Sequence, residues 1–168
     1  GLYAGSAAAS EPAGLQVRIG YLAYIPDPGP LLSNVIPEPL DAGRRGAELA
    51  INDSNSTGRF LKQQYQLDSA QHESSDALLA AADALHAEGV RLFVVNAPAD
   101  TLQALSARLG DSLLLNAGSA DDGLRQANCL SNVLHTLPSR AMLADALVQF
   151  LAVRRWQRAW RMLSRSSV

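Results

Sequence analysis

The sequence predicts an α/β fold, a three-layer sandwich in which helices cover a mostly parallel sheet. Hydrophobic residues make up 48% of the 168 residues but aromatic residues only 5%, so the apolar content is mostly Ala and Leu. That mixture suits helices packed on a sheet better than an all-β sandwich. Strand-like and helix-like patterns also alternate along the chain, as they do when helices connect parallel strands. Finally, residues 90–95 (VRLFVV) are a continuous apolar run, typical of a strand covered on both faces.

The first half of the chain predicts two strands around one helix. Residues 16–24 (QVRIGYLAY) read as a strand that ends at a cluster of proline and glycine. Apolar residues recur at helical spacing over residues 40–53, and Pro39 and Asp41 are expected to start a helix there. The polar segment 52–58 is expected to end it. Residues 60–68 (FLKQQYQLD) alternate as a strand does, and a polar loop is expected at 71–75.

Two further helices flank the apolar strand at 90–95. Residues 76–87 are rich in Ala and Leu and end at Gly89, a typical helix stop. Asp100 or Thr101 is expected to cap the next helix, which carries Leu at helical spacing and stops at Gly110.

The last third of the chain predicts two short strands and a helix. Residues 112–115 form a buried strand, and residues 129–136 (CLSNVLHT) form a short one. Pro138 and Ser139 then start a helix over residues 140–153.

In a parallel sheet, ligands bind beyond the carboxyl ends of the strands. Here those ends are the loops 24–29, 96–100 and 116–121, with Asn96 and Asn116 among them. Their small residues allow a ligand close to the backbone, and free N–H groups at a helix start suit a carboxylate or another anion. The alternative is that these are ordinary turns between strands and helices.

Several function classes lack their signatures. No GxGxxG follows the first strand and no P-loop occurs, which argues against a dinucleotide or nucleoside triphosphate enzyme. The net charge of -2 and the absence of a long basic block argue against nucleic-acid binding. No apolar run approaches the roughly 18 residues of a membrane span. His72, His86 and His135 are too scattered to predict a metal site.

Two candidate catalytic groups remain, and neither is favoured. Cys129 is the only cysteine, so it is either a buried thiol or pairs outside this chain. As a nucleophile it needs a base, but His135 on the same strand would be roughly 20 Å away. Asp121 and Asp122 are adjacent loop carboxylates, which are more often solvated or capping than catalytic. We therefore expect no catalytic residues, with a small hydrolase-like α/β enzyme as the alternative.

Two segments resemble the opening of type I periplasmic binding proteins. RIGYLAYIPD (residues 18–27) matches the first strand, and GAELAINDSNSTGRFL (residues 46–61) matches a helix of the form xGAxLAIxxxN that precedes a glycine turn. That turn usually reads NxxGG in the family, whereas Arg59 replaces the second glycine here. The departure puts an amino-acid ligand in doubt.

Other segments are similar to one branch, the ABC-transporter substrate-binding proteins encoded alongside PQQ-dependent alcohol dehydrogenase systems. They are VVNAPADTLQAL, LLNAGSADDGLRQANC and VLHTLPSRAMLADALVQFL, and the resemblance covers residues 16–160.

The resemblance implies a periplasmic protein that holds a small solute in a cleft between two lobes and presents the closed form to a membrane permease. It implies no cofactor, with PQQ itself a possible ligand. By location, it places the ligand contacts at Tyr24, Asp27, Asn96, Ala97, Asn116, Ala117, Gly118 and Ser119.

The resemblance also suggests three parts to the chain. Residues 1–14 would be the remainder of a secretory signal peptide or a flexible tail, residues 15–153 an N-terminal ligand-binding lobe, and residues 154–168 a truncated crossover into a second lobe. The five arginines of that last segment could instead form a basic interaction tail, which would make the chain a single-lobe protein-interaction module. Trp156 and Trp160, if exposed, would favour self-association.

Overall fold

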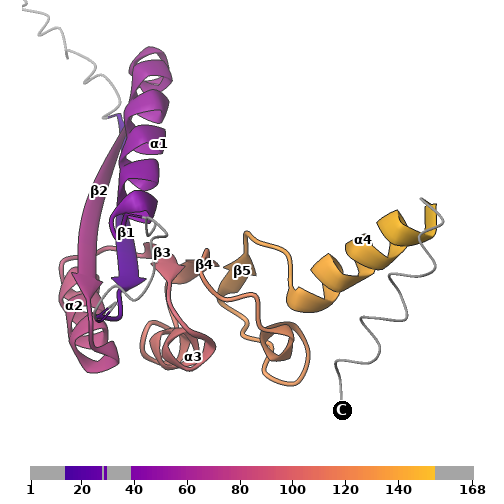
Figure 1. The fold of residues 1–168 in the computed structure, drawn as a ribbon. Helices are drawn as coiled ribbons and strands as arrows, with labels where there is room; N and C mark the ends of the chain where they lie inside the picture. The colour runs from indigo at the N-terminus through magenta and orange to yellow at the C-terminus, as the bar shows by residue number, and fades with distance from the viewer. Residues whose placement is uncertain (1–13, 28, 30–38, 154–168) are drawn as a thin grey trace, which may run out of the picture.

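The structure, a computed structural model, describes residues 14–27, 29 and 39–153, which form an α/β unit around a five-stranded parallel sheet in the order β2-β1-β3-β4-β5 (Figure 1). The elements are, in chain order, β1 (Leu15–Tyr24), α1 (Ala42–Gly58), η1 (Arg59–Leu61), β2 (Gln63–His72), α2 (Ser75–Ala87), β3 (Leu92–Asn96), α3 (Ala99–Arg108), β4 (Leu113–Asn116), η2 (Asp122–Arg125), β5 (Val133–His135) and α4 (Arg140–Val153). The predicted strand and helix order is confirmed.

The main core lies between the sheet and helices α2 and α3. Leu22, Phe93 and Leu114 project from three neighbouring strands and are fully buried. The helices contribute Leu78 and Leu102 to the same cluster. A Cβ on Gly20 would lie 2.5 Å from the Phe93 ring, so the absence of a side chain there lets the ring pack flat against β1.

The opposite face of the sheet is covered only in part by the described residues. Helix α1 packs against β2, and Gly43 of α1 closely approaches the buried Tyr21 of β1. Farther along the sheet, Leu113 of β4 and Leu134 of β5 are 39% and 55% exposed.

The expected polar stop of the first helix is wrong, because α1 continues to Gly58. Tertiary contacts support the extra turns. The Asn55 side chain donates to the carbonyl oxygen of Tyr65 at 2.8 Å and accepts from the Tyr65 N–H at 2.7 Å. Asn55 thus forms hydrogen bonds with the backbone of β2 on the side that has no neighbouring strand. Helix propensity alone does not reveal such a contact.

The second strand is also shifted from its expected position. Residues 59–61 form the short helix η1, and β2 runs from Gln63 to His72, which takes in the first two residues of the polar loop expected at 71–75. Each of its ten residues pairs with β1, from Leu15 with Gln63 to Tyr24 with His72. The length of the partner strand therefore sets the length of β2.

Two smaller expectations are corrected. Pro98 occupies the N-cap position of α3, so neither Asp100 nor Thr101 is the cap. Strand β5 is confined to residues 133–135, which places Cys129 in the preceding loop. Cys129 is exposed, so a buried thiol is wrong.

Helix α4 has its predicted bounds but extends away from the sheet beyond β5 (Figure 1). Four of its large apolar side chains are about half exposed, namely Met142, Leu143, Leu147 and Phe150, whereas Leu151 is buried. The segment expected to be the crossover, with Trp156 and Trp160, lies outside the described residues, as do residues 1–13 of the expected tail.

Candidate functional site at the carboxyl ends of the strands

The predicted loops meet at one edge of the sheet, which we call the carboxyl-end rim (residues 24–29, 96–100 and 116–121). Strand pairing places Ala23 beside Asn96 and Val95 beside Asn116. The N–H of Ala117 also donates to the Val95 carbonyl at 2.8 Å, which joins the loops after β3 and β4. The parallel arrangement thus brings together residues that are 21 positions apart (Val95 and Asn116) and 73 positions apart (Ala23 and Asn96) in the sequence.

Asn116 organises this rim from a fully buried position. Its amide group donates to the Ser119 carbonyl at 2.7 Å and lies 2.9 Å from Nδ1 of His135. Its carbonyl oxygen accepts from the N–H groups of Gly118 and Ser119 at 3.2 and 2.9 Å. Both ends of the side chain are therefore engaged within the protein.

These bonds correct the expectation of free backbone donors in the loop after β4. The N–H groups of Ala117, Gly118 and Ser119 all have acceptors inside the protein. Anion binding through the Gly118 and Ser119 N–H groups would require the Asn116 side chain to move. The polar side chains that the rim exposes are instead those of Asn96, Asp27 and Asp100, and Tyr24 is half-buried.

The other predicted contacts differ in accessibility. Ala117 and Gly118 are exposed, whereas Ala97 and Ser119 are 4% and 9% exposed. Asp27 accepts from the N–H of Gly29 at 3.0 Å, which shapes its own turn. The structure gathers the eight residues along one rim, and their contact with a ligand stays a prediction.

Gly118 allows the loops after β3 and β4 to touch. A Cβ at this position would collide with Oδ1 of Asn96 and would lie 2.6 Å from the Ala97 backbone nitrogen. Backbone atoms cannot yield as a flexible side-chain end can. A glycine is therefore needed for the observed spacing of the rim.

We expect Gly118→Ala to lower the free energy of unfolding by about 2 kcal/mol, because the added methyl group forces the two loops apart. Urea unfolding followed by circular dichroism measures the change. Gly46→Ala is the matched control, since a Cβ there meets nothing within 4 Å and alanine favours a helix interior. Equal stability of the Gly118→Ala variant and the wild type would contradict the steric argument.

His135 is a rim residue that sequence reasoning did not assign to this site. It pairs with Asn116 in the sheet register, and burial, helped by the positive charge of Arg125, lowers the pKa of its imidazole. Nδ1 of the neutral ring accepts from the Asn116 amide, so the single N–H proton of the ring is on Nε2. The only signal in the sequence is that His135 follows the buried Val133 by two residues, so both side chains lie on the same face of β5.

The lowered pKa of His135 predicts a loss of stability in mild acid. A histidine that is harder to protonate when folded stabilises the protein above its unfolded pKa of about 6.5, and this contribution falls as the pH drops toward the lower folded value. Unfolding free energies measured between pH 7.5 and 5 should therefore decline, with a smaller decline in His135→Gln. Identical pH profiles for the two proteins would contradict this role.

Asp121, Asp122 and Cys129 do not assemble into a catalytic group in the described part of the chain. Asp121 accepts from the Gly123 N–H and caps η2. Asp122 accepts from the N–H of Ala141, and a hydrogen bond from the Ser139 hydroxyl lowers the pKa of its carboxyl. Both carboxylates therefore have capping roles, the interpretation that the sequence favoured.

Two further searches cover the described residues alone. Among them, no three His, Cys, Asp or Glu side chains gather as a metal ion would require. Within the same ranges, no helix has the length and apolar character to cross a bilayer.

A structural relative supports the expected fold. A crystal structure of a leucine-, isoleucine-, valine-, threonine- and alanine-binding protein from Brucella ovis, in its closed conformation, matches with a TM-score of 0.55 and 16% sequence identity. The chain has the fold of a type I periplasmic binding protein. The match covers 74% of this chain and 33% of the relative, so this chain spans about a third of the length of that protein. No family profile and no curated protein sequence matches.

Proposed function

We propose that the chain belongs to the periplasmic solute-binding component of an ABC transporter and captures a small molecule without chemical change. Its ligand would lie against the carboxyl-end rim and be enclosed by a second lobe, as in the two-lobed family that the sequence resembles. The partners would be the solute and a membrane permease. The branch associated with PQQ-dependent alcohol dehydrogenase systems remains our preferred placement.

The observation that carries this proposal is the convergence of three loops on one rim. Parallel sheets bind ligands at this edge. Here the Ala117–Val95 hydrogen bond and the close approach of Gly118 to Asn96 join the loops after β3 and β4, and the pairing of Ala23 with Asn96 brings the loop after β1 beside them. The solved relative with the same fold is a binding protein by name. The capping roles of Asp121 and Asp122 weaken the enzyme alternative.

The engaged amides refine the expected chemistry of the ligand. With Asn116 accepting from two N–H groups of the loop after β4, the exposed polar side chains are the Asn96 carboxamide and the Asp27 and Asp100 carboxylates. These side chains suit a polar solute that offers hydrogen-bond donors. Ala117 and Gly118 add a surface without bulky side chains, over which a flat or apolar part of the solute would fit.

An NMR titration of the whole chain tests the proposal. The panel contains PQQ and the five amino acids in the relative's name. Because the rim supplies only one wall of a cleft, we expect weak binding, in the millimolar range, with shifts of the Asn96, Ala117 and Gly118 amides. The control variant Asn128→Ala, an exposed side chain outside the rim, should bind equally. Shifts confined to other parts of the sheet would contradict the site, and nanomolar affinity would contradict the need for a second wall.

A further inference from the structure

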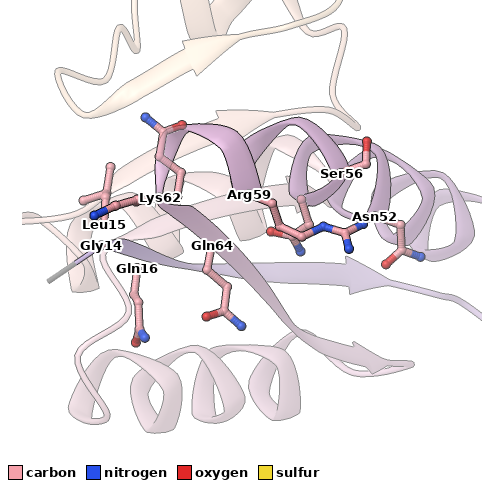
Figure 2. A pocket seen from close by; sticks show the side chains of 10 residues that line it. Gly14, Leu15, Gln16, Asn52, Ser56, Arg59, Lys62 and Gln64 are labelled. Atoms are coloured by element: carbon pink, nitrogen blue, oxygen red, sulfur yellow. The ribbon is translucent and has the colours of Figure 1, made fainter.

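A pocket of about 880 Å³ lies at the opposite edge of the sheet, away from the carboxyl-end rim. It is formed by the carboxyl-terminal half of α1, η1 and the amino ends of β1 and β2 (Figure 2). At about 3.3 Å per strand residue, Gln16 in its wall is roughly 25 Å from Tyr24 at the rim. The pocket is therefore separate from the proposed solute site.

The wall of this pocket is positively charged. Two of its ten lining residues are the cations Arg59 and Lys62, and none is acidic. The others include side chains that donate hydrogen bonds, namely Gln16, Asn52, Ser56 and Gln64. The carboxyl end of α1 contributes only about half a negative charge, which the guanidinium of Arg59 outweighs.

The position of these groups follows from the end of α1. Asn52, Ser56 and Arg59 are four and three residues apart, which places them on one face of the helix. Figure 2 shows the lining side chains of Asn52 in α1 and Arg59 in η1 on the helical side of the pocket, and those of Gln16 and Gln64 on the two strands. A guanidinium flanked by neutral donors is a common arrangement for binding the oxygens of phosphate or carboxylate.

Close backbone contacts fix the walls. A Cβ on Gly58 would lie 2.6 Å from the Gln63 carbonyl, and one on Gly14 would lie 2.5 Å from the Lys62 carbonyl. The two Asn55–Tyr65 hydrogen bonds also hold α1 against β2. These contacts fix the backbone that carries Arg59, so the wall of the pocket is formed before any ligand arrives.

We infer that this pocket is a second binding site, specific for an oxyanion such as a phosphate group, with Arg59 as the main contact. The phosphate belongs either to a small soluble molecule or to a lipid headgroup. A lipid headgroup is supported by Phe60 and Leu61, which follow Arg59 and are 89% and 62% exposed. Apolar side chains beside a basic site are typical of attachment to anionic membranes.

The first arm of the test titrates the whole chain with sodium phosphate, using sodium chloride of equal ionic strength as the reference, and records amide shifts by NMR. We expect shifts at Asn52, Ser56 and Arg59, and at least a tenfold weaker affinity in Arg59→Ala. Arg45→Ala is the matched control, because it removes the same charge from an exposed position at the other end of α1.

The second arm measures sedimentation with phosphatidylglycerol vesicles and with phosphatidylcholine vesicles. An Arg59-dependent response to free phosphate supports a soluble ligand. Arg59-dependent binding to phosphatidylglycerol vesicles alone supports a lipid headgroup. The inference is overturned if neither probe binds, or if Arg59→Ala and Arg45→Ala reduce binding equally. Circular dichroism of both variants confirms that the fold is retained.

Discussion

Replacing Phe93 with alanine is expected to lower the free energy of unfolding by about 4 kcal/mol. Phe93 is the largest fully buried side chain, at the centre of the cluster between the sheet and helices α2 and α3. Removal of the ring eliminates apolar burial and leaves a cavity that the rigid strands cannot close. Since domains of this size are stable by about 5 to 15 kcal/mol, the variant should still fold but unfold at much lower urea concentration.

Phe60→Ala is the matched control for this measurement. Its ring is 89% exposed, so truncation should change the unfolding free energy by less than about 0.5 kcal/mol. Two-state urea unfolding of both variants provides the comparison. A loss below 1 kcal/mol for Phe93→Ala would show that the core is not packed as described.

Asn116→Ala is expected to cost about 3 kcal/mol and to loosen the carboxyl-end rim. The substitution leaves the N–H groups of Gly118 and Ser119 without their acceptor and the Ser119 carbonyl without its donor. Each buried polar group left unpaired costs about 1 to 3 kcal/mol, although water entering the opened loop would reduce the sum. The same variant should raise amide exchange rates at residues 118 and 119.

Asn128→Ala separates this effect from the general loss of an asparagine. Asn128 is exposed, and only its backbone N–H makes a hydrogen bond, to the Gly123 carbonyl. Its replacement should change stability by less than about 0.5 kcal/mol. If both asparagine variants unfold at the same urea concentration, the organising role of Asn116 is wrong.

Part of the site could be predicted because strand direction follows from local patterns. Once residues 16–24, 90–95 and 112–115 are recognised as parallel strands, their carboxyl ends must share an edge. This reasoning brought Asn96 and Asn116 together before the structure did. It also allowed a capping role for Asp121, which depends on the nearby Gly123 N–H. The cap that Asp122 provides for Ala141 spans nineteen residues and needed the tertiary structure.

The remaining features depend on contacts between distant segments. The Asn55 bonds to Tyr65 span ten residues and extend α1 through a polar segment that looks like a helix stop. The Asn116–His135 contact spans nineteen residues and gives His135 a place at the rim. Sequence patterns do not show which polar side chain satisfies which backbone group.

The sequence by itself determined the order of strands and helices, the parallel sheet and the edge at which the loops 24–29, 96–100 and 116–121 meet. These properties follow from the spacing of apolar residues, which is a local quantity. Only the tertiary structure decided that the amides after β4 are already engaged, that Cys129 is exposed and that cationic groups line a pocket at the opposite edge. The physical reason is that burial and hydrogen-bond partners are set by packing between segments far apart in the chain.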